Sequence, residues 1–136
     1  MYKFTGFTTK ANNAINFAVL SAEEMGHTYV GSEHLLLGLL RESTGVAAML
    51  LTHKGLIYEE LWKTILDLVG KGDLTALSPT DFSTRCRRIL ENALMELKLS
   101  GQTLAGTEHI LLALLHEPDS TAMKTMTARR LDCTSL

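Results

Sequence analysis

The sequence predicts an all-α fold in which two pseudo-symmetric four-helix repeats pack into one domain. The first observation is a ten-residue segment beginning at Gly31 that recurs, with few changes, from Gly106. The second is that apolar residues return every three or four positions, the spacing of one face of a helix. The third is that no segment alternates apolar and polar residues as a half-buried strand does. A copied segment of this kind indicates duplication of one supersecondary unit.

Length and composition are those of a single globular domain, expected over 1–136. The chain has 136 residues, of which 46% are hydrophobic, and a formal net charge of −2. This charge argues against a nucleic-acid surface, and no apolar run reaches the roughly 18 residues of a membrane span. The first residues lack the apolar core of a signal peptide. The two cysteines show no metal-type spacing, and Cys86 is interpreted as a small core residue. We therefore expect a reduced, cytoplasmic protein.

The first repeat is predicted to open with a helix over 8–25. Thr8 is the expected N-cap, because its hydroxyl can accept an amide hydrogen of the first turn. Gly26 is expected to end this helix in the left-handed region. A second helix is predicted over 33–41 with Ser32 as its N-cap. This helix is apolar almost all round and should be the most buried element.

Two further helices complete the first repeat. One is predicted over 46–54 and ends at Gly55. The other is predicted over 58–69, and its expected inward residues are Leu61, Ile65, Leu68 and Val69. A stretch containing Gly, Ser, Pro and Asp then predicts a linker. We expect repeat one over about 4–71, the linker over about 72–81 and repeat two over about 82–131.

The second repeat follows the same plan. A helix is predicted over 83–99 and is closed by Gly101, and Thr107 is expected to cap a helix over 108–116. A shorter helix is predicted over 120–128. No convincing counterpart of the fourth helix follows before Leu136, so the last helix of repeat two is expected to be missing or atypical.

Glu33 and Glu108 each stand in the first turn of a capped helix, one in each repeat. The simpler interpretation is that each carboxylate complements the helix dipole, which contributes about 0.3–1 kcal/mol. The other interpretation is a binding pocket, because the preceding glycine turn leaves the helix end accessible. A carboxylate could bind a guanidinium there while the free amides of the first turn hold an anionic group.

His34 and His109 follow these carboxylates and raise the question of a metal site. Adjacent helical residues point about 100° apart, so one Glu-His pair is poorly placed to chelate one ion. No third ligand recurs at a fixed offset, and the H-E-x-x-H spacing of zinc proteases is absent. We expect buried histidines that brace the preceding loop, and no metal.

The sequence carries no enzymatic motif and predicts a binding module without catalytic residues or a cofactor. It has neither the G-x-x-x-x-G-K-[ST] loop that cradles phosphates nor the G-x-S-x-G nucleophile elbow. The second half is slightly basic, and we interpret its arginines as a solvated helix face rather than a nucleic-acid site. These residues are Arg85, Arg87, Arg88, Arg129 and Arg130.

The motifs resemble a known family. The pattern consists of Phe7-Thr8-x-x-Ala11, then Gly26-His27, then the run G-S-E-H-L-L-L-G-L-L-R-E from Gly31, and the run from Gly106 doubles it. It is similar to the Clp amino-terminal repeat domain, which opens the Clp ATPase unfoldases, and most similar to the ClpC type. The resemblance covers the chain from about Phe4 to Leu131.

This resemblance implies an all-α domain that is mobile on a linker ahead of two ATPase (AAA+) modules. Such a domain receives adaptor proteins and marked substrates and passes them to an unfolding ring coupled to the Clp protease. ATP is implied only for a longer parent protein. ClpC-type domains recognise phosphorylated arginine, one site per repeat. The family's acidic site residues fall on Glu33 and Glu108, and its hydroxyl residues fall on Thr8 and Ser83.

Several residues depart from the family pattern. Ser83 stands where threonine is commoner, and Gln102 occupies the position equivalent to His27. The last ten residues do not resemble the family. A free-standing relative that competes for adaptors without ATPase modules therefore remains an alternative to a fragment of a longer ATPase.

Overall fold

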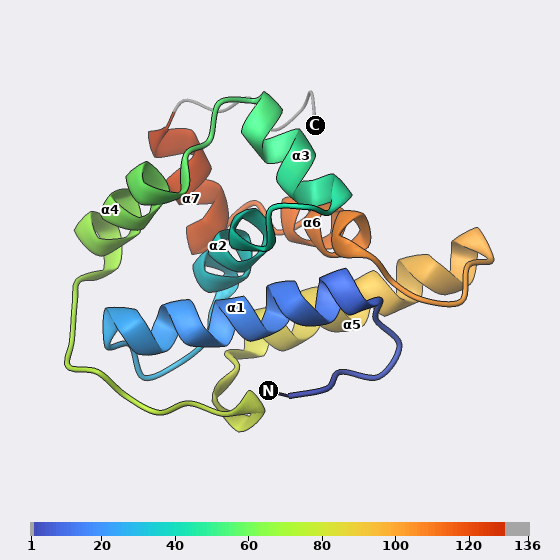
Figure 1. The fold of residues 1–136 in the computed structure, drawn as a ribbon, viewed down its shortest axis with the longest axis horizontal. Coiled ribbons are helices and arrows are strands. Elements are labelled where there is room, and N and C mark those ends of the chain that lie inside the picture. Colours follow the sequence, from blue (N-terminus) through green and yellow to red (C-terminus); the bar gives the residue numbers. More distant parts are fainter. Residues whose placement is uncertain (1, 130–136) are drawn as a thin grey trace.

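The computed structural model describes residues 2–129, and these form an all-α fold, as predicted (Figure 1). No strand occurs among them; two isolated β-bridges are the only extended pairings. The helices are α1 Thr9–Met25, α2 Ser32–Glu42, α3 Val46–His53, α4 Tyr58–Val69, the short 3₁₀-helix η1 Pro79–Asp81, α5 Thr84–Ser100, α6 Thr107–Leu115 and α7 Thr121–Ala128. Any eighth helix would fall after α7, where residues 130–136 and the second cysteine lie outside the described residues.

Helix α2 is the centre of the core, as its apolar sequence predicts. It packs against every other α-helix of the described residues, and Figure 1 shows it nearly end-on in the middle of the molecule. All its residues except Arg41 are buried. A Cβ at Gly38 would come within 2.2 Å of the Ala14 carbonyl oxygen. The glycine therefore permits the close crossing of α1 and α2.

Helix α1 is capped by Thr8, as predicted, and α5 is capped by Ser83, which the sequence analysis places inside the helix. Thr8 Oγ1 accepts a hydrogen bond from the Ala11 amide at 3.1 Å, and Ser83 Oγ accepts one from the Cys86 amide at 3.0 Å. Each hydroxyl satisfies an amide that has no partner inside the helix. Cys86 is a buried core residue, as expected, and burial raises the pKa of its thiol to about 12.

Each repeat exchanges backbone contacts with the other. The segment before α1 pairs with the loop before α6, where the Thr8 amide donates to the Ala105 carbonyl at 2.9 Å. The segment before α5 pairs with the loop before α2, where the Ser83 amide donates to the Val30 carbonyl at 2.9 Å. These two contacts occupy equivalent positions in the repeats. The duplication therefore produces a pseudo-twofold arrangement in which each repeat helps to build the other.

The predicted capping roles of Ser32 and Thr107 are wrong. Helices α2 and α6 begin at these residues, and glycines are their N-caps. Ser32 Oγ instead accepts from the Ala122 amide in α7 at 3.1 Å, and Thr107 Oγ1 accepts from the Ala47 amide in α3 at 3.2 Å. Both hydroxyls cap a helix of the other repeat, which a pattern confined to neighbouring residues cannot indicate.

The prediction for α4 is correct at Leu61 and Ile65, which are buried, and wrong at Leu68 and Val69, which are exposed. Helix α4 packs on α2 and α7. Its last turn continues past them at the outer edge of the molecule (Figure 1). The apolar stripe of the sequence is therefore longer than the surface available to cover it.

Candidate functional site

Two pockets contain the residues that the sequence singles out. The first, here the Glu33–Ser83 pocket, has a volume of about 260 Å³. The residues that line it are Tyr29, Gly31, Ser32, Glu33, Ser83, Arg85, Asp119, Ser120 and Thr121. The carboxylate comes from α2 in the first repeat, and the hydroxyl comes from the start of α5 in the second.

The second, here the Thr8–Glu108 pocket, has a volume of about 550 Å³. Its polar lining includes Thr8, Lys10, Thr44, Thr107 and Glu108. The hydroxyl comes from the first repeat and the carboxylate from the second. All four predicted site residues therefore lie in pockets, but each pocket draws on both repeats rather than on one.

The two carboxylates lie in different surroundings. Glu33 is only 2% exposed, and the Tyr29 hydroxyl donates to its Oε2 at 2.8 Å. Burial and the adjacent Glu33 raise the pKa of Tyr29 far above its usual range. Glu108 is exposed, and Leu104 occupies the position equivalent to Tyr29. The accessible helix end expected from the sequence is thus present at Glu108, whereas Tyr29 covers it at Glu33.

Each carboxylate folds back over the glycine that precedes its helix. A Cβ built on Gly31 would lie 2.5 Å from Glu33 Oε1, and one on Gly106 would lie even closer to Glu108 Oε1. Neither glycine has a positive φ. The repeated glycine therefore leaves room for the carboxylate to sit beside the amino end of the helix.

The two hydroxyls keep a free donor function. Thr8 and Ser83 use an oxygen lone pair to cap their own helices. A hydroxyl has one donor hydrogen in addition to two acceptor lone pairs. Each pocket can therefore offer an O–H donor to an anion while its carboxylate accepts hydrogen bonds from a cation.

Each pocket also contains a cationic residue that the sequence reasoning did not assign to it. Lys10 and Arg85 stand two positions after the hydroxyl residues, at equivalent places in the two repeats. Lys10 Nζ donates to the Thr44 carbonyl at 3.3 Å, and Arg85 Nε lies 3.9 Å from Glu117. The fixed spacing from the hydroxyl in both copies was the available signal. Arg85 thus lines a pocket and does not belong only to a solvated face.

Both histidines brace the preceding loops, as expected, but only His34 is buried, whereas His109 is half-buried. His34 Nδ1 accepts from the Gly31 amide at 2.8 Å, and His109 Nδ1 accepts from the Gly106 amide at 2.9 Å. His34 Nε2 also lies 2.7 Å from His27 Nδ1. Burial and the neighbouring His27 lower the pKa of His34 to about 3, so this ring is neutral at physiological pH.

No metal-binding arrangement is present in the part of the chain that the structure describes. No group of three or more His, Cys, Asp or Glu side chains there could hold an ion. Glu33 is hydrogen-bonded to Tyr29, and each histidine accepts from the glycine that caps its own helix. A metal-dependent enzyme has no supporting observation within residues 2–129.

The sequence profile of the Clp repeat (R) N-terminal domain matches residues 6–129. The chain belongs to this family. A ClpA homolog from Guillardia theta, named an ATP-dependent Clp protease ATP-binding subunit, is 35% identical over 133 residues, covering 98% of this chain and 16% of that protein. Chloroplastic chaperone protein ClpC1 of Arabidopsis thaliana is 35% identical over 123 residues, covering 90% of this chain and 13% of that protein.

Solved Clp N-terminal domains share the fold. The N-terminal domain of the caseinolytic protease associated chaperone ClpD from Arabidopsis thaliana has a TM-score of 0.81 at 23% identity, covering 98% of this chain and 93% of that one. The N-terminal domain of the ClpV1 ATPase from E. coli has a TM-score of 0.70 at 20% identity, covering 90% and 76%. The two likenesses show a common architecture.

Membership in the Clp N-terminal family makes this chain a non-catalytic binding domain. It spans only 16% and 13% of the two relatives named above. The cytoplasmic location stays a prediction, because relatives include chloroplast proteins. Among the described residues, no single helix is long and apolar enough to cross a membrane. Helices α2 and α3 reach that length and apolar content only together, and they are bent by 95°.

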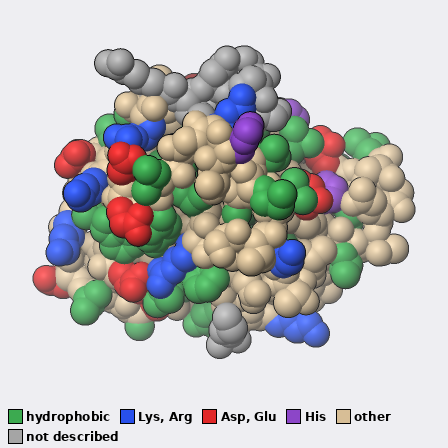
Figure 2. Space-filling view, turned by 45° about the horizontal axis from the view of Figure 1, so that its top comes forward, with side chains coloured by type: hydrophobic (Ala, Val, Ile, Leu, Met, Phe, Trp, Pro, Cys, Tyr) green, Lys and Arg blue, Asp and Glu red, His purple; other side chains and the backbone are tan. Residues whose placement is uncertain are grey.

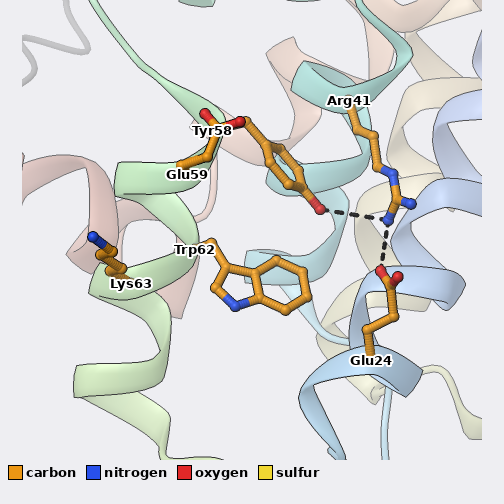
Figure 3. Close-up of a pocket in the computed structure, with 6 residues that line it drawn as sticks. All are labelled: Glu24, Arg41, Tyr58, Glu59, Trp62 and Lys63. Atoms are coloured by element: carbon orange, nitrogen blue, oxygen red, sulfur yellow. Dashed lines mark hydrogen bonds and ion pairs between the residues drawn. The ribbon is translucent and has the colours of Figure 1, made fainter.

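The Clp domain also has a pocket in the first repeat that the sequence did not indicate. It has a volume of about 460 Å³ between α1, α2 and α4 (Figure 3). Arg41 crosses it, donating to Glu24 at 2.8 Å and approaching the Tyr58 hydroxyl at 3.5 Å. Its guanidinium also lies 5.1 Å from the centre of the Phe17 ring. Arg41 is thus held by side chains of the domain itself, and Trp62 forms an opposite wall.

Proposed function

We propose that this domain binds proteins that carry phosphorylated arginine, with one phosphoarginine side chain in each of the two pockets. The observation that carries the proposal is the repeated chemical set: a carboxylate, a hydroxyl and a cation line both pockets. The same three groups recur although the carboxylate comes from the first repeat in one pocket and from the second repeat in the other.

The set matches the two halves of a phosphoarginine side chain. The guanidinium half has several N–H donors in one plane, which a carboxylate such as Glu33 or Glu108 can accept. The phosphoryl half carries negative charge and acceptor oxygens. These suit the hydroxyls of Thr8 and Ser83 together with Lys10 and Arg85. An unmodified arginine would bring no anionic group to the cation in each pocket.

Helix ends add to the anion-binding character of both pockets. The first amides of a helix have no intrahelical acceptor, and the helix dipole favours negative charge at this end. The starts of α2 and α6 line the Glu33–Ser83 pocket and the Thr8–Glu108 pocket, respectively. The glutamate at each helix start carries a negative charge, so the proposal needs the guanidinium to lie between the carboxylate and the phosphoryl group.

In a longer parent protein, the domain would deliver marked substrates and adaptor-bound proteins to ATPase modules and a Clp protease. Clp N-terminal domains serve adaptors and substrates in general, and the finer assignment to arginine-phosphorylated proteins is the proposal. The chain alone has no unfolding activity under this proposal. Its role would be to select which proteins are delivered to the ATPase modules.

Calorimetric titration with free phosphoarginine tests the proposal. We expect the parent domain to bind it, and the Glu33→Gln/Glu108→Gln variant to lose at least about tenfold in affinity, since each glutamine removes a charge-assisted contact. Arginine and inorganic phosphate serve as ligand controls. Equal binding of arginine and phosphoarginine, or no binding by a parent domain whose circular dichroism shows it folded, would refute the proposal.

A further inference from the structure

The two pockets differ in what borders them. Beside the Thr8–Glu108 pocket stand three exposed apolar side chains, Val46 at 46%, Met49 at 65% and Leu104 at 49% exposure. All three line that pocket. The equivalent positions in the other repeat hold Thr121, Lys124 and Tyr29. Only the Thr8–Glu108 pocket therefore has an apolar border.

The apolar border continues away from the polar groups along one helix face. Val46 is the first residue of α3 and Met49 lies three positions later, so the two side chains are neighbours on the same face. Leu104 reaches the same pocket from the loop before α6. Figure 2 shows hydrophobic side chains on this face with acidic, basic and histidine side chains around them. The surface is thus an apolar strip joined to a charged pocket.

We infer that the Thr8–Glu108 pocket selects phosphoarginine that has a large apolar residue two positions away in the chain, whereas the Glu33–Ser83 pocket is indifferent to that residue. This inference rests on the proposed function and adds a substrate preference to it. The occupant is an extended peptide segment, because side chains two positions apart then lie on the same side of the chain, about 6–7 Å apart, and the strip adjoins the pocket.

Charge supports a peptide rather than a second apolar surface as the occupant. Lys10 and Glu108 line the same pocket as the strip, and a wholly apolar partner would bury both charges, which is costly. A peptide with a phosphoarginine and a leucine two positions away matches both parts. The phosphoarginine meets the charges, and the leucine covers Met49.

The test compares two phosphoarginine peptides that differ only in having leucine or serine two positions before and two positions after the modified residue. The titrations use the Glu33→Gln variant, so that the Thr8–Glu108 pocket is measured, and the Glu108→Gln variant as the matched control for the other pocket. With Glu33→Gln we expect the leucine peptide to bind about fivefold more tightly, from partial burial of the leucine. With Glu108→Gln we expect a ratio near one.

Met49→Gln in the Glu33→Gln background keeps the side-chain length and removes its apolar character. We expect the leucine-to-serine ratio to fall to near one. Equal binding of the two peptides in the Glu33→Gln background overturns this inference while the proposed function stands. Failure of both peptides to bind the parent domain overturns both. A dimer of the domain that Met49→Gln abolishes, with equal peptide affinities, would assign the strip to a second copy and also overturn the inference.

Discussion

Glu33 and Ser83 line the same pocket although they belong to different repeats. The backbone explains how they meet: the Ser83 amide donates to the Val30 carbonyl at 2.9 Å, and Val30 lies in the loop that leads into α2 and Glu33. Thr8 and Glu108 meet through the equivalent contact at Ala105. Neither pocket could form in an isolated repeat. The duplicated sequence therefore encodes two sites only when both copies fold together.

Alanine should destabilise the domain to different extents at Gly31 and Gly106, the glycines beside the two carboxylates. A Cβ on Gly31 would meet Glu33, which is buried and bonded to Tyr29, whereas one on Gly106 would meet the exposed Glu108. We expect Gly31→Ala to lower the free energy of unfolding by about 1–3 kcal/mol, since overpacking is costly, and Gly106→Ala to cost less. Urea denaturation of both variants measures this, and equal losses would contradict the different confinement of the two carboxylates.

Ser32 and Thr107 should act as caps between the repeats. Each buried hydroxyl accepts a helix amide from the other repeat. We expect Ser32→Ala and Thr107→Ala each to cost about 1 kcal/mol of stability, the usual value of a lost cap. Thr107→Ser keeps the hydroxyl and is the matched control. Thermal unfolding that is unchanged by either alanine would show that these contacts contribute nothing.

The leucines of the copied segment should differ in their contribution to stability. Leu37 is fully buried, and its counterpart Leu112 is 41% exposed. We expect Leu37→Ala to cost about 2–5 kcal/mol, as buried leucines do, and Leu112→Ala to cost under about 1 kcal/mol. Denaturant unfolding of the two variants checks the difference. A similar cost for both would contradict the exposed position of Leu112.

Because of His34, the domain should become less stable as the pH falls below 6.5, the ordinary pKa of histidine. Its pKa is lowered from 6.5 to about 3 in the folded chain, so between these values the unfolded chain binds a proton that the folded chain does not. Unfolding is then favoured as pH falls, by at most about 1.4 kcal/mol per pH unit. The stabilising contribution of the neutral His34 ring is fully present above pH 6.5 and is lost progressively as the pH falls toward 3.

His34→Gln isolates this effect from that of the carboxylates. We expect the variant to be less stable at pH 7.5 and to lose less stability than the parent between about pH 7.5 and pH 5. Urea denaturation at both pH values gives the comparison. An identical loss in parent and variant would show that His34 does not stay neutral in the folded chain.

The sequence was sufficient for much of the fold because the local signals are strong. Thr8 and Gly26 marked the two ends of α1, and Gly101 marked the end of α5, through chemistry that acts within a few residues. The sequence could not show that Ser32 would cap α7, because that contact depends on how the repeats pack. The exposed end of α4 was missed for the same reason.

The candidate site was predicted residue by residue but not as an assembly. Glu33, Glu108, Thr8 and Ser83 all line pockets, although their pairing across the repeats follows only from tertiary contacts. Tyr29, which covers Glu33, could not be identified from the repeat, because the equivalent residue in the second repeat is Leu104. The cations Lys10 and Arg85 could have been found from their constant distance after the hydroxyl residue.

The most direct test of the account counts phosphoarginine sites by calorimetry in two double variants. Glu33→Gln/Ser83→Ala removes two groups from one pocket, whereas Glu33→Gln/Thr8→Ala removes one group from each. The account predicts that the first variant keeps one site with the parent's affinity and that the second has two weakened sites. The reverse pattern would contradict assembly of the pockets across the repeats, and absence of binding in the parent would contradict the proposed ligand.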